Sequence, residues 1–486
     1  MLVVELNQSN YEYDVHSMVS SFYPEEQVRV LIPECSQAKR QELQQEVRIR
    51  VELGEEGALF AADGEEFRWK APGEDRHVLA REYKEGFKRF LYQTLSRITG
   101  KELPWGSLTG IRPTKIAYAM LEQGAGAQEI ESFYREKYFV SQEKAGLSID
   151  IAGREQKLLQ SLGNQEEGYS LYLGIPFCPT TCMYCSFTSF PLGLYRKKVD
   201  TYVDCLVKEM EQAARLRRGK RLDCVYLGGG TPTTLEPCQL DRLLGELERL
   251  FDLGGVKEYT VEAGRADSIT PEKLQVLRRR GVGRISVNPQ TMQQRTLDLI
   301  GRKASVEQVE EAYGLAREMG FDNINMDLIL GLPGETEEDV RRTVERVVEM
   351  APDSLTVHSL AVKRASRLSQ WVQENGVSLL HNTDETMRIA AEGAVRLGLA
   401  PYYLYRQKNM SGNFENVGYA REGKFGLYNI LIMEEVQTIV ALGAGSISKR
   451  VHPDGRIERS ENVKDVAQYM ERIEEMMDRK RALLQE

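Results

Sequence analysis

Residues 175–185 read IPFCPTTCMYC and place Cys178, Cys182 and Cys185 on one short stretch of the chain. The other four cysteines are scattered singly. Three thiolates on one loop can bind three irons of a [4Fe-4S] cube, while the fourth iron stays open to a small molecule. The spacing therefore predicts an iron–sulfur cluster held by these three cysteines.

Two other interpretations of the triplet are open. A structural zinc site ordinarily takes a second pair of closely spaced Cys or His ligands, and the histidines of this chain are isolated in the sequence. Neighbouring cysteines can also pack in a core without binding metal. The absence of a second ligand pair from the sequence favours the cluster over zinc.

The composition predicts a globular cytoplasmic protein. A chain of 486 residues is longer than one core usually supports, so two or three domains are expected. No apolar run approaches the roughly 18 residues that span a bilayer, and the N-terminus MLVVELNQSNYEYD lacks the features of a signal peptide. The formal net charge of -9 argues against broad binding to nucleic acid.

The pattern of the chain changes twice, which predicts three parts. Residues 1–165 are expected to form an N-terminal α+β domain, residues 166–375 an α/β barrel core, and residues 376–486 a small C-terminal module that covers the substrate. Within the first part we expect strands and one long helix, at 28–32, 47–51, 58–62 and about 75–98.

From residue 169 onward, six short apolar strands alternate with amphipathic helices. This order predicts parallel strands joined by right-handed crossovers, and hence a partial or full TIM-like barrel or, as the alternative, a doubly wound sheet. Polar residues recur where successive strands end, which is where barrel enzymes place their sites. The barrel is therefore the favoured interpretation.

A glycine run, Gly228 to Gly230, follows the second of these strands. Glycines let the backbone approach a ligand closely, although alone such a run is more often a tight turn. One strand after the cysteine loop, it becomes a candidate wall for a ligand on the open iron.

These motifs resemble those of the radical S-adenosylmethionine (SAM) superfamily, and within it the oxygen-independent coproporphyrinogen III dehydrogenase family. The resemblance is carried by the cysteine triplet with Tyr184, by GGGTPT at 228–233 and by DLILGLPGET at 327–336. It extends over about residues 169–450. The segment TGIRPTK at 109–115 resembles that of the longer members.

The resemblance implies a [4Fe-4S] cluster on Cys178, Cys182 and Cys185, with SAM bound to the open iron through its amino and carboxylate groups. Taken singly, each matching residue also has an ordinary structural role as its alternative, such as a solvated carboxylate, an ion pair or a turn cap. The residues that match the family's SAM contacts are Tyr172, Gly229, Gly230, Thr231, Glu262, Gln290, Arg302, Asp327 and Ala361.

The resemblance further implies an oxidoreductase of heme biosynthesis, in which a 5'-deoxyadenosyl radical starts the conversion of coproporphyrinogen III propionates to the vinyl groups of protoporphyrinogen IX. It implies a tetrapyrrole substrate and a small electron-transfer protein as reductant. Basic residues are candidate partners of the propionates, and a tyrosine group is a candidate floor for the macrocycle or part of a core. These residues are Arg112, Lys115, Lys363, Arg364, Arg406, Lys408, Tyr402, Tyr403 and Tyr405.

Two departures from the family pattern leave the reaction open. Phe187 stands where the dehydrogenases carry a further cysteine, a position that is aromatic in related heme-trafficking proteins, and Asn288 and Pro289 precede Gln290. One alternative is a heme-binding delivery protein, for which His358 is the nearest axial-ligand candidate. Another is a different radical reaction on a tetrapyrrole.

Overall fold

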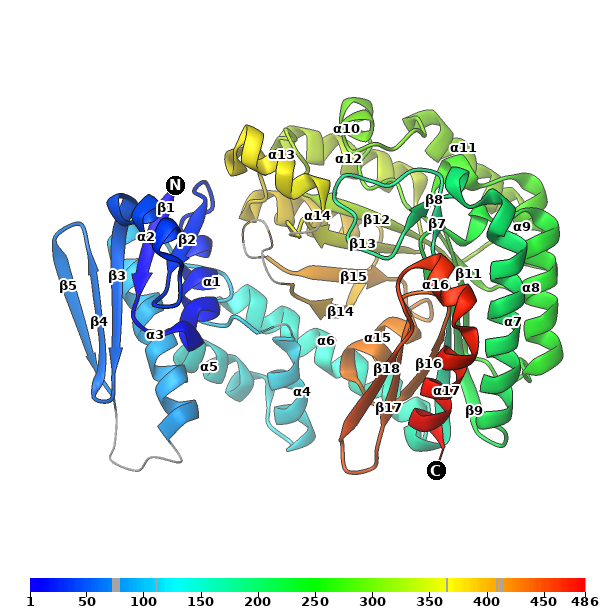
Figure 1. Ribbon diagram of the computed structural model, residues 1–486, viewed down its shortest axis with the longest axis horizontal. Helices are drawn as coiled ribbons and strands as arrows, with labels where there is room; N and C mark the ends of the chain where they lie inside the picture. The colour runs from blue at the N-terminus through cyan, green and yellow to red at the C-terminus, as the bar shows by residue number, and fades with distance from the viewer. Residues whose placement is uncertain are drawn as a thin grey trace.

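Two large β-sheets, one small two-stranded sheet and the helices that pack on them make up the described residues (Figure 1). The computed structural model describes residues 1–71, 79–110, 112–363, 366–407, 410, 412 and 414–485, with only the backbone described at 79–81. Within these residues, the smaller of the two large sheets belongs to the N-terminal part of the chain and the larger sheet to the remainder.

The N-terminal sheet has five strands in the order β2-β1-β3-β4-β5. The predicted strands are present as β2, β3 and β4, and the predicted long helix is α3, although its expected start near residue 75 lies outside the described residues. The sheet packs on α1 and α3 around a core of its own. The bounds are β1 Leu2–Leu6, α1 Glu12–Phe22, β2 Val28–Leu31, α2 Gln37–Leu43, β3 Val47–Gly54, β4 Gly57–Ala62, β5 Glu65–Lys70 and α3 Leu79–Thr99.

Three helices connect the two sheets: α4 (Thr114–Glu122), α5 (Ala127–Tyr138) and α6 (Gln142–Ser161). Their buried side chains, such as Tyr134 and Ile151, belong to the same continuous core as the larger sheet. The division of the chain into domains at 165/166 and 375/376 stays a prediction.

The six expected strands are adjacent and parallel in the larger sheet. This confirms the predicted strand–helix units, because parallel neighbours need a crossover between them. The strands are β6 Gly168–Ile175, β9 Arg221–Gly229, β10 Glu258–Gly264, β11 Arg284–Val287, β12 Ile324–Leu330 and β13 Ser354–Ser359. The connecting helices are α7 Val199–Leu216, α8 Pro237–Leu250, α9 Pro271–Arg279, α10 Gln294–Leu299, α11 Val306–Glu318 and α12 Glu337–Met350.

The two faces of this sheet differ in polarity. One face carries apolar side chains such as Leu171, Val225 and Val261, which belong to the large core. The crossover helices lie against this face and against one another, α7 on α8 and α8 on α9. A doubly wound sheet would place crossover helices on both faces. The favoured interpretation, a TIM-like barrel that is at least partial, is therefore confirmed.

The sheet is an open, partial barrel. Its full order is β14-β15-β13-β12-β11-β10-β9-β6-β16-β17-β18, and within the described residues the outermost strands are not paired with each other. Two antiparallel strands extend it beyond β13, namely β14 (Ala400–Tyr405) and β15 (Asn416–Ala420). At the other edge, β16 (Thr438–Leu442) runs parallel to β6 and is followed by β17 (Ile447–Val451) and β18 (Ile457–Glu461).

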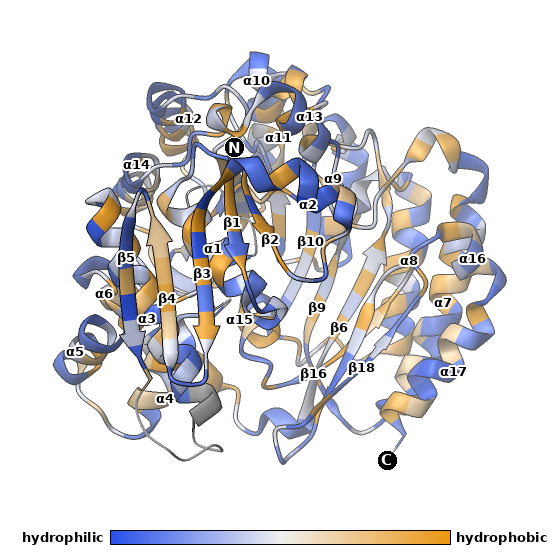
Figure 2. Cartoon of the chain, turned by 60° about the vertical axis from the view of Figure 1, so that its left-hand side comes forward, coloured by the Kyte–Doolittle hydropathy of each residue, from blue (hydrophilic) through white to orange (hydrophobic). Residues whose placement is uncertain are grey.

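The remaining helices pack around this sheet. Helix α15 (Leu427–Glu434) fills the polar face near the amino ends of the strands, where its Leu431 and Tyr428 join a cluster with Tyr402. Figure 2 shows hydrophilic and hydrophobic residues mixed along the outer helices α7 and α17, as expected where one side of a helix faces a sheet. In the described part of the chain, no helix has the length and apolar character for a membrane crossing. The other helices are α13 Arg367–Asn375, α14 Asp384–Arg396, α16 Val466–Glu471 and α17 Ile473–Leu484.

Candidate cofactor site

The cysteine loop begins where β6 ends, at the carboxyl edge of the parallel strands. The short strand β7 (Phe177–Cys178) pairs with β8 (Phe190–Pro191), so the segment between them leaves the sheet edge and returns to it. All three cysteines of the triplet lie on this segment or at its start, and each is a free thiol. The structure thus places the triplet at the carboxyl edge, where barrel enzymes build their sites.

Each sulfur of the triplet has a polar neighbour. Cys178 Sγ lies 3.5 Å from Thr231 Oγ1, Cys185 Sγ lies 3.5 Å from Ser189 Oγ, and Cys182 Sγ lies 3.7 Å from a guanidinium nitrogen described below. Burial raises the pKa of the Cys178 thiol to about 11, an effect that the contact with Thr231 partly offsets. Because metals bind the thiolate, cluster binding must displace this proton.

The three thiols of the loop do not surround a single metal position, and the predicted cluster stays a prediction. In the residues that the structure describes, no three His, Cys, Asp or Glu side chains converge on a single metal position. Three sulfurs around one zinc would have to lie about 4 Å apart, as tetrahedral Zn–S bonds require. The ligands of a [4Fe-4S] cube each bind a different iron and need not converge in this way.

The end of β9 is fastened directly to the cysteine loop. The backbone amide of Gly230 donates to the carbonyl of Ile175 at 2.7 Å, and that of Thr231 donates to the carbonyl of Phe177 at 2.7 Å. A Cβ on Gly230 would lie 2.6 Å from the Phe177 carbonyl oxygen, which is too close. Glycine is therefore required for this contact, and the predicted contact of Gly229 and Gly230 with SAM stays a prediction.

The polar face of the sheet begins below this loop with Tyr172 and Glu262. Strand register places Tyr172 beside Tyr226, and Tyr226 beside the residue two positions before Glu262, so all three point to one face. Their neighbour Tyr428 stacks on Tyr226 with ring centroids 4.5 Å apart. The Tyr226 hydroxyl donates to Glu262 Oε1 at 2.5 Å.

The Glu262 carboxyl has a pKa near neutral pH. Burial raises its pKa to about 7; the hydrogen bond from Tyr226 partly offsets this, and the charge of Asp327 adds to it. A carboxyl with this pKa changes protonation state close to physiological pH. It could therefore accept a hydrogen bond from an ammonium group when ionised.

Asp327 and His358 continue the polar face on β12 and β13. Asn325 Nδ2 donates to Asp327 Oδ1 at 2.7 Å, and His358 Nε2 lies 3.9 Å from Asp327 Oδ2. Burial lowers the pKa of His358, although Asp327 acts in the opposite direction. His358 is therefore predominantly neutral at pH 7.

Gln290 is held at the same edge by its backbone. Its φ of 68° is in the left-handed region, its amide donates to the carbonyl of Asp327 at 2.9 Å, and its carbonyl accepts from Ile329 N at 2.9 Å. These bonds join the segment after β11 to β12. The structure therefore brings Gln290 and Asp327 together, and their contact with SAM stays a prediction.

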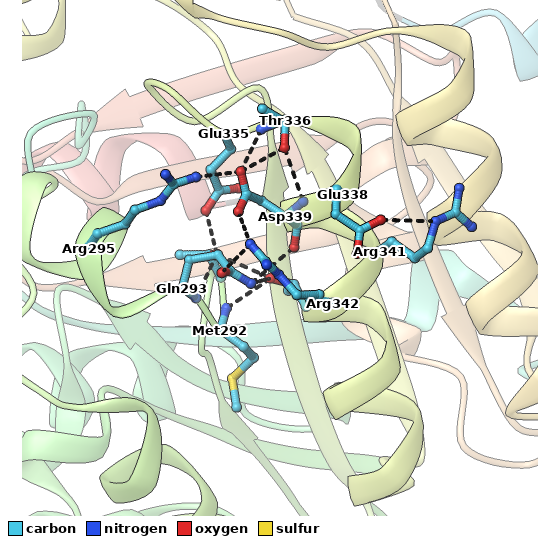
Figure 3. A network of polar contacts seen from close by, with 11 residues as sticks. Met292, Gln293, Arg295, Glu335, Thr336, Glu338, Asp339, Arg341 and Arg342 are labelled. Atoms are coloured by element: carbon cyan, nitrogen blue, oxygen red, sulfur yellow. Dashed lines mark hydrogen bonds and ion pairs between the residues drawn. The ribbon is translucent and has the colours of Figure 1, made fainter.

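A second set of contacts fixes the segment that follows Gln290 to the start of α12 (Figure 3). Thr291 Oγ1 donates to Glu335 Oε1 at 2.5 Å, and Arg295 pairs with Asp339 at 2.5 Å. Burial raises the pKa of Glu335 to about 7, an effect that the bond from Thr291 partly offsets. Glu335 belongs to the DLILGLPGET motif. Through its bond to Thr291, this motif holds the residue next to Gln290 in place.

Arg302 joins the cysteine loop to the end of β11, and its surroundings carry unsatisfied polar atoms. Its Nη1 donates to the Asn288 carbonyl at 2.5 Å, and its Nη2 donates to the Tyr184 hydroxyl at 3.4 Å. Within the described residues, the buried Nε of Arg302 and Oδ1 of Asn288 have no partner. Buried polar atoms are rarely left unpaired, so a ligand with both donor and acceptor groups fits this position.

The residues that the sequence suggested as substrate contacts lie in different parts of the molecule. Arg112 pairs with Glu435 at 2.9 Å, just before β16 starts, and so lies by the amino ends of the strands. Arg406 is 4% exposed and donates to the Leu108 carbonyl at 2.6 Å. Neither is brought to the cysteine loop, and the exposed Lys115 lies on α4 close to Arg112.

Residues that follow β13 are closer to the edge where the cysteines lie. Ala361 forms an isolated bridge with Met410, and burial lowers the pKa of Lys363. Arg364 and Lys408 lie outside the described residues. Tyr402 and Tyr403 are buried in a hydrophobic cluster, as expected if the tyrosines form part of a core, whereas Tyr405 is half-buried.

Arg265 is a site residue that the sequence did not predict. Its Nη1 lies 3.7 Å from Cys182 Sγ and donates to the Thr180 carbonyl at 2.9 Å, while Nη2 pairs with Asp267 at 2.7 Å. It follows β10 directly, so its place after a strand end was the available signal. A cation beside a cysteine sulfur stabilises the thiolate and added negative charge.

Comparisons with known proteins agree with this geometry. Residues 172–347 match the Radical SAM superfamily. The chain is 40% identical over 408 residues to the oxygen-independent coproporphyrinogen-III oxidase-like protein HemZ of Bacillus subtilis, which covers 82% of this chain and 81% of that protein. The chain belongs to this coproporphyrinogen oxidase-like family of radical SAM proteins.

Two further relatives differ in their described activities. The heme chaperone HemW of B. subtilis is 34% identical over 211 residues, covering 43% of this chain and 55% of that protein. The structure of coproporphyrinogen III oxidase HemN from Escherichia coli superposes with a TM-score of 0.52 and 25% identity, covering 66% of this chain and 73% of that one. The family thus includes proteins named as oxidases and as chaperones.

Replacing Arg265 with Gln should make the cluster harder to reduce. The loss of a positive charge next to Cys182 disfavours the added electron, so the midpoint potential should become more negative by on the order of tens of millivolts. Arg265→Lys keeps the charge and should shift the potential less. A redox titration followed by electron paramagnetic resonance measures both, with Arg242→Gln as a surface control; equal potentials in all variants would exclude this influence.

Replacing Glu262 with Gln should change how stability depends on pH. Because burial raises the pKa of Glu262 from 4.5 to about 7, this carboxyl favours the folded state below pH 4.5, and that contribution is lost as the pH rises to 7. The free energy of unfolding of the wild type, relative to the variant, should fall by about 3 kcal/mol over this range and then stay level.

Urea unfolding at several pH values measures this difference in the protein without bound SAM. Glu422→Gln, a substitution at an exposed carboxylate, is the control for loss of one negative charge. A difference between wild type and Glu262→Gln that does not vary with pH would show that Glu262 is not buried as described.

Proposed function

We propose that this protein catalyses the oxygen-independent oxidative decarboxylation of coproporphyrinogen III. The observation that supports this most is the convergence of three free thiols, the polar face of β10 to β13 and unsatisfied donor and acceptor atoms at one sheet edge. This arrangement provides cluster ligands, contacts for an amino acid group and a polar surface beside them.

The protein's own residues would bind and orient the reactants. Cys178, Cys182 and Cys185 would hold the cluster, and Glu262 and Arg302 offer an acceptor for the amino group of SAM and a donor for its carboxylate. Cluster and SAM together supply a 5'-deoxyadenosyl radical, which is chemistry that belongs to the cofactor. Stacking of Tyr172, Tyr226 and Tyr428 closes the sheet beneath the site and so excludes water from that side.

The proposed reaction converts a propionate side chain to a vinyl group. A hydrogen atom would pass from the carbon next to the ring to the 5'-deoxyadenosyl radical, the carboxylate would leave as carbon dioxide, and one electron would pass to an external acceptor. His358, a neutral imidazole on the polar face, could donate a hydrogen bond to a propionate oxygen. As a half-buried imidazole beside Asp327, it would position the substrate.

Heme delivery is the second candidate function. It is favoured by the 34% identity to a heme chaperone and by Phe187, which is 75% exposed at the position where the dehydrogenases carry a cysteine. A neutral His358 could also serve as an axial ligand. A different radical reaction on a tetrapyrrole remains a third candidate within the same cofactor chemistry.

An anaerobic assay distinguishes these functions. We expect reconstituted protein with reductant, SAM and coproporphyrinogen III to yield carbon dioxide and vinyl products, which chromatography and mass spectrometry detect. Cys182→Ser should lose the cluster absorbance and at least about 99% of the turnover, whereas Cys238→Ser, at an exposed cysteine away from the loop, should keep both.

The opposite result would favour the second candidate. If the wild type cleaves no SAM with this substrate and instead binds heme stoichiometrically, the proposal of a decarboxylase is wrong. Cleavage of SAM with a different tetrapyrrole product would favour the third candidate.

A further inference from the structure

The segment between the third cysteine and α7 exposes two large apolar side chains. Phe187 is 75% exposed and Leu194 is 77% exposed, more than any other large hydrophobic residue that the structure describes. Single exposed apolar residues are common on protein surfaces. Here two such residues lie on one 13-residue segment, residues 186–198, that directly follows the cysteine triplet.

The same segment is positively charged in an acidic protein. Residues 186–198 include Arg196, Lys197 and Lys198 but no Asp or Glu, whereas the whole chain has a formal net charge of -9. All three cations are exposed. Across the ranges that the structure describes, the ion pairs include none of the three.

Arginines on the neighbouring helix α8, in contrast, form ion pairs with carboxylates. Arg242 on α8 pairs with Asp204 on α7 at 2.5 Å, and Arg249 pairs with Glu211 at 3.2 Å. The nearest carboxylate in sequence, Asp200, accepts a hydrogen bond from Gln239 at 2.7 Å. Carboxylates of this surface are thus used by other partners, and the three cations of the segment stay available.

The segment that carries the charged and apolar residues is joined to the cysteine loop at two points. Strand β8 pairs with β7, placing Pro191 beside Cys178, and Phe187 follows Cys185 by two positions. The Tyr195 ring packs against Phe177 and Phe190 with centroids 5.9 and 5.4 Å apart, which fixes the segment to the loop. An electron that enters the candidate cluster through this surface would have a short path.

We propose that Phe187, Leu194, Arg196, Lys197 and Lys198 form the docking surface for a small acidic one-electron carrier protein that reduces the cluster. This inference rests on the proposed function, because it takes the cysteine loop as the cluster site. One electron leaves the reduced carrier and enters the cluster, and no bond is made or broken. The five residues are called the loop surface below.

The chemistry of the loop surface matches that kind of partner. An apolar centre with a charged rim is usual for protein interfaces, and complementary charge raises association rates while it leaves the complex short-lived. Electron transfer also weakens steeply with distance, so a carrier must approach the cluster closely. Two apolar side chains are few for insertion into a membrane, so we favour a protein partner over an anionic lipid surface.

Charge reversal at the loop surface tests this proposal. In Arg196→Glu/Lys197→Glu/Lys198→Glu, reduction of the cluster by a reduced acidic flavodoxin at low salt should slow by on the order of tenfold or more, because electrostatic steering is lost. Reduction by dithionite should be unchanged, and high salt should narrow the difference between wild type and variant. Anaerobic stopped-flow absorbance follows both reductants.

A matched control reverses three exposed cations elsewhere. Lys39→Glu/Lys157→Glu/Lys257→Glu changes the formal net charge by the same amount on other surfaces and should be reduced by flavodoxin at nearly the wild-type rate. A second variant, Phe187→Ser/Leu194→Ser, alters the apolar centre without changing charge. It should weaken binding of oxidised flavodoxin to the protein, with or without its cluster, in a titration calorimeter.

The inference fails if the charge reversal and its control are reduced by flavodoxin at equal rates. It also fails if the wild type binds anionic vesicles, the reversal abolishes that binding, and flavodoxin reduction is unaffected, which would assign the loop surface to a membrane. Reduction and binding are measured without coproporphyrinogen III. A protein that makes no vinyl product can therefore still confirm or contradict the docking surface. Failure of the docking proposal can thus be told apart from failure of the proposed decarboxylase function.

Discussion

The parallel alignment of six strands is the constraint on which the site depends. Parallel strands end at one edge of their sheet, so segments far apart in sequence are brought to the same place. Cys178, Thr231, Arg265 and Gln290 each follow such a strand, and Asp327 lies within β12. No other feature of the chain would collect these side chains, since they span about 150 residues of sequence.

Close backbone contacts make this edge rigid. Gly230 allows the end of β9 to bond to the cysteine loop, and the left-handed Gln290 joins the end of β11 to β12. Side chains then support these backbones from behind, with Thr291 bonded to the buried Glu335. A cofactor site of this kind is held by its surroundings before any ligand binds, which lowers the entropic cost of binding.

Local features of this protein could be predicted from the sequence, and contacts between distant segments could not. The cysteine triplet and the six alternating strands have short-range signatures, and both occur as expected. The pairing of β16 with β6 and the contact of Arg265 with Cys182 join residues far apart in the chain, so no spacing indicated them. Arg406 was a candidate substrate contact because basic residues often bind carboxylates. In the structure it is buried, and its guanidinium lies over the Trp105 ring.

The central claim is that the cysteine loop holds a [4Fe-4S] cluster with one iron that no protein sulfur binds. Mössbauer spectroscopy of anaerobically reconstituted, iron-57-labelled protein tests it most directly. The account predicts a cluster in which one iron in four has a distinct signal, and this signal changes when SAM is added. Four equivalent irons that do not respond to SAM, or a protein that takes up zinc and no cluster, would contradict it.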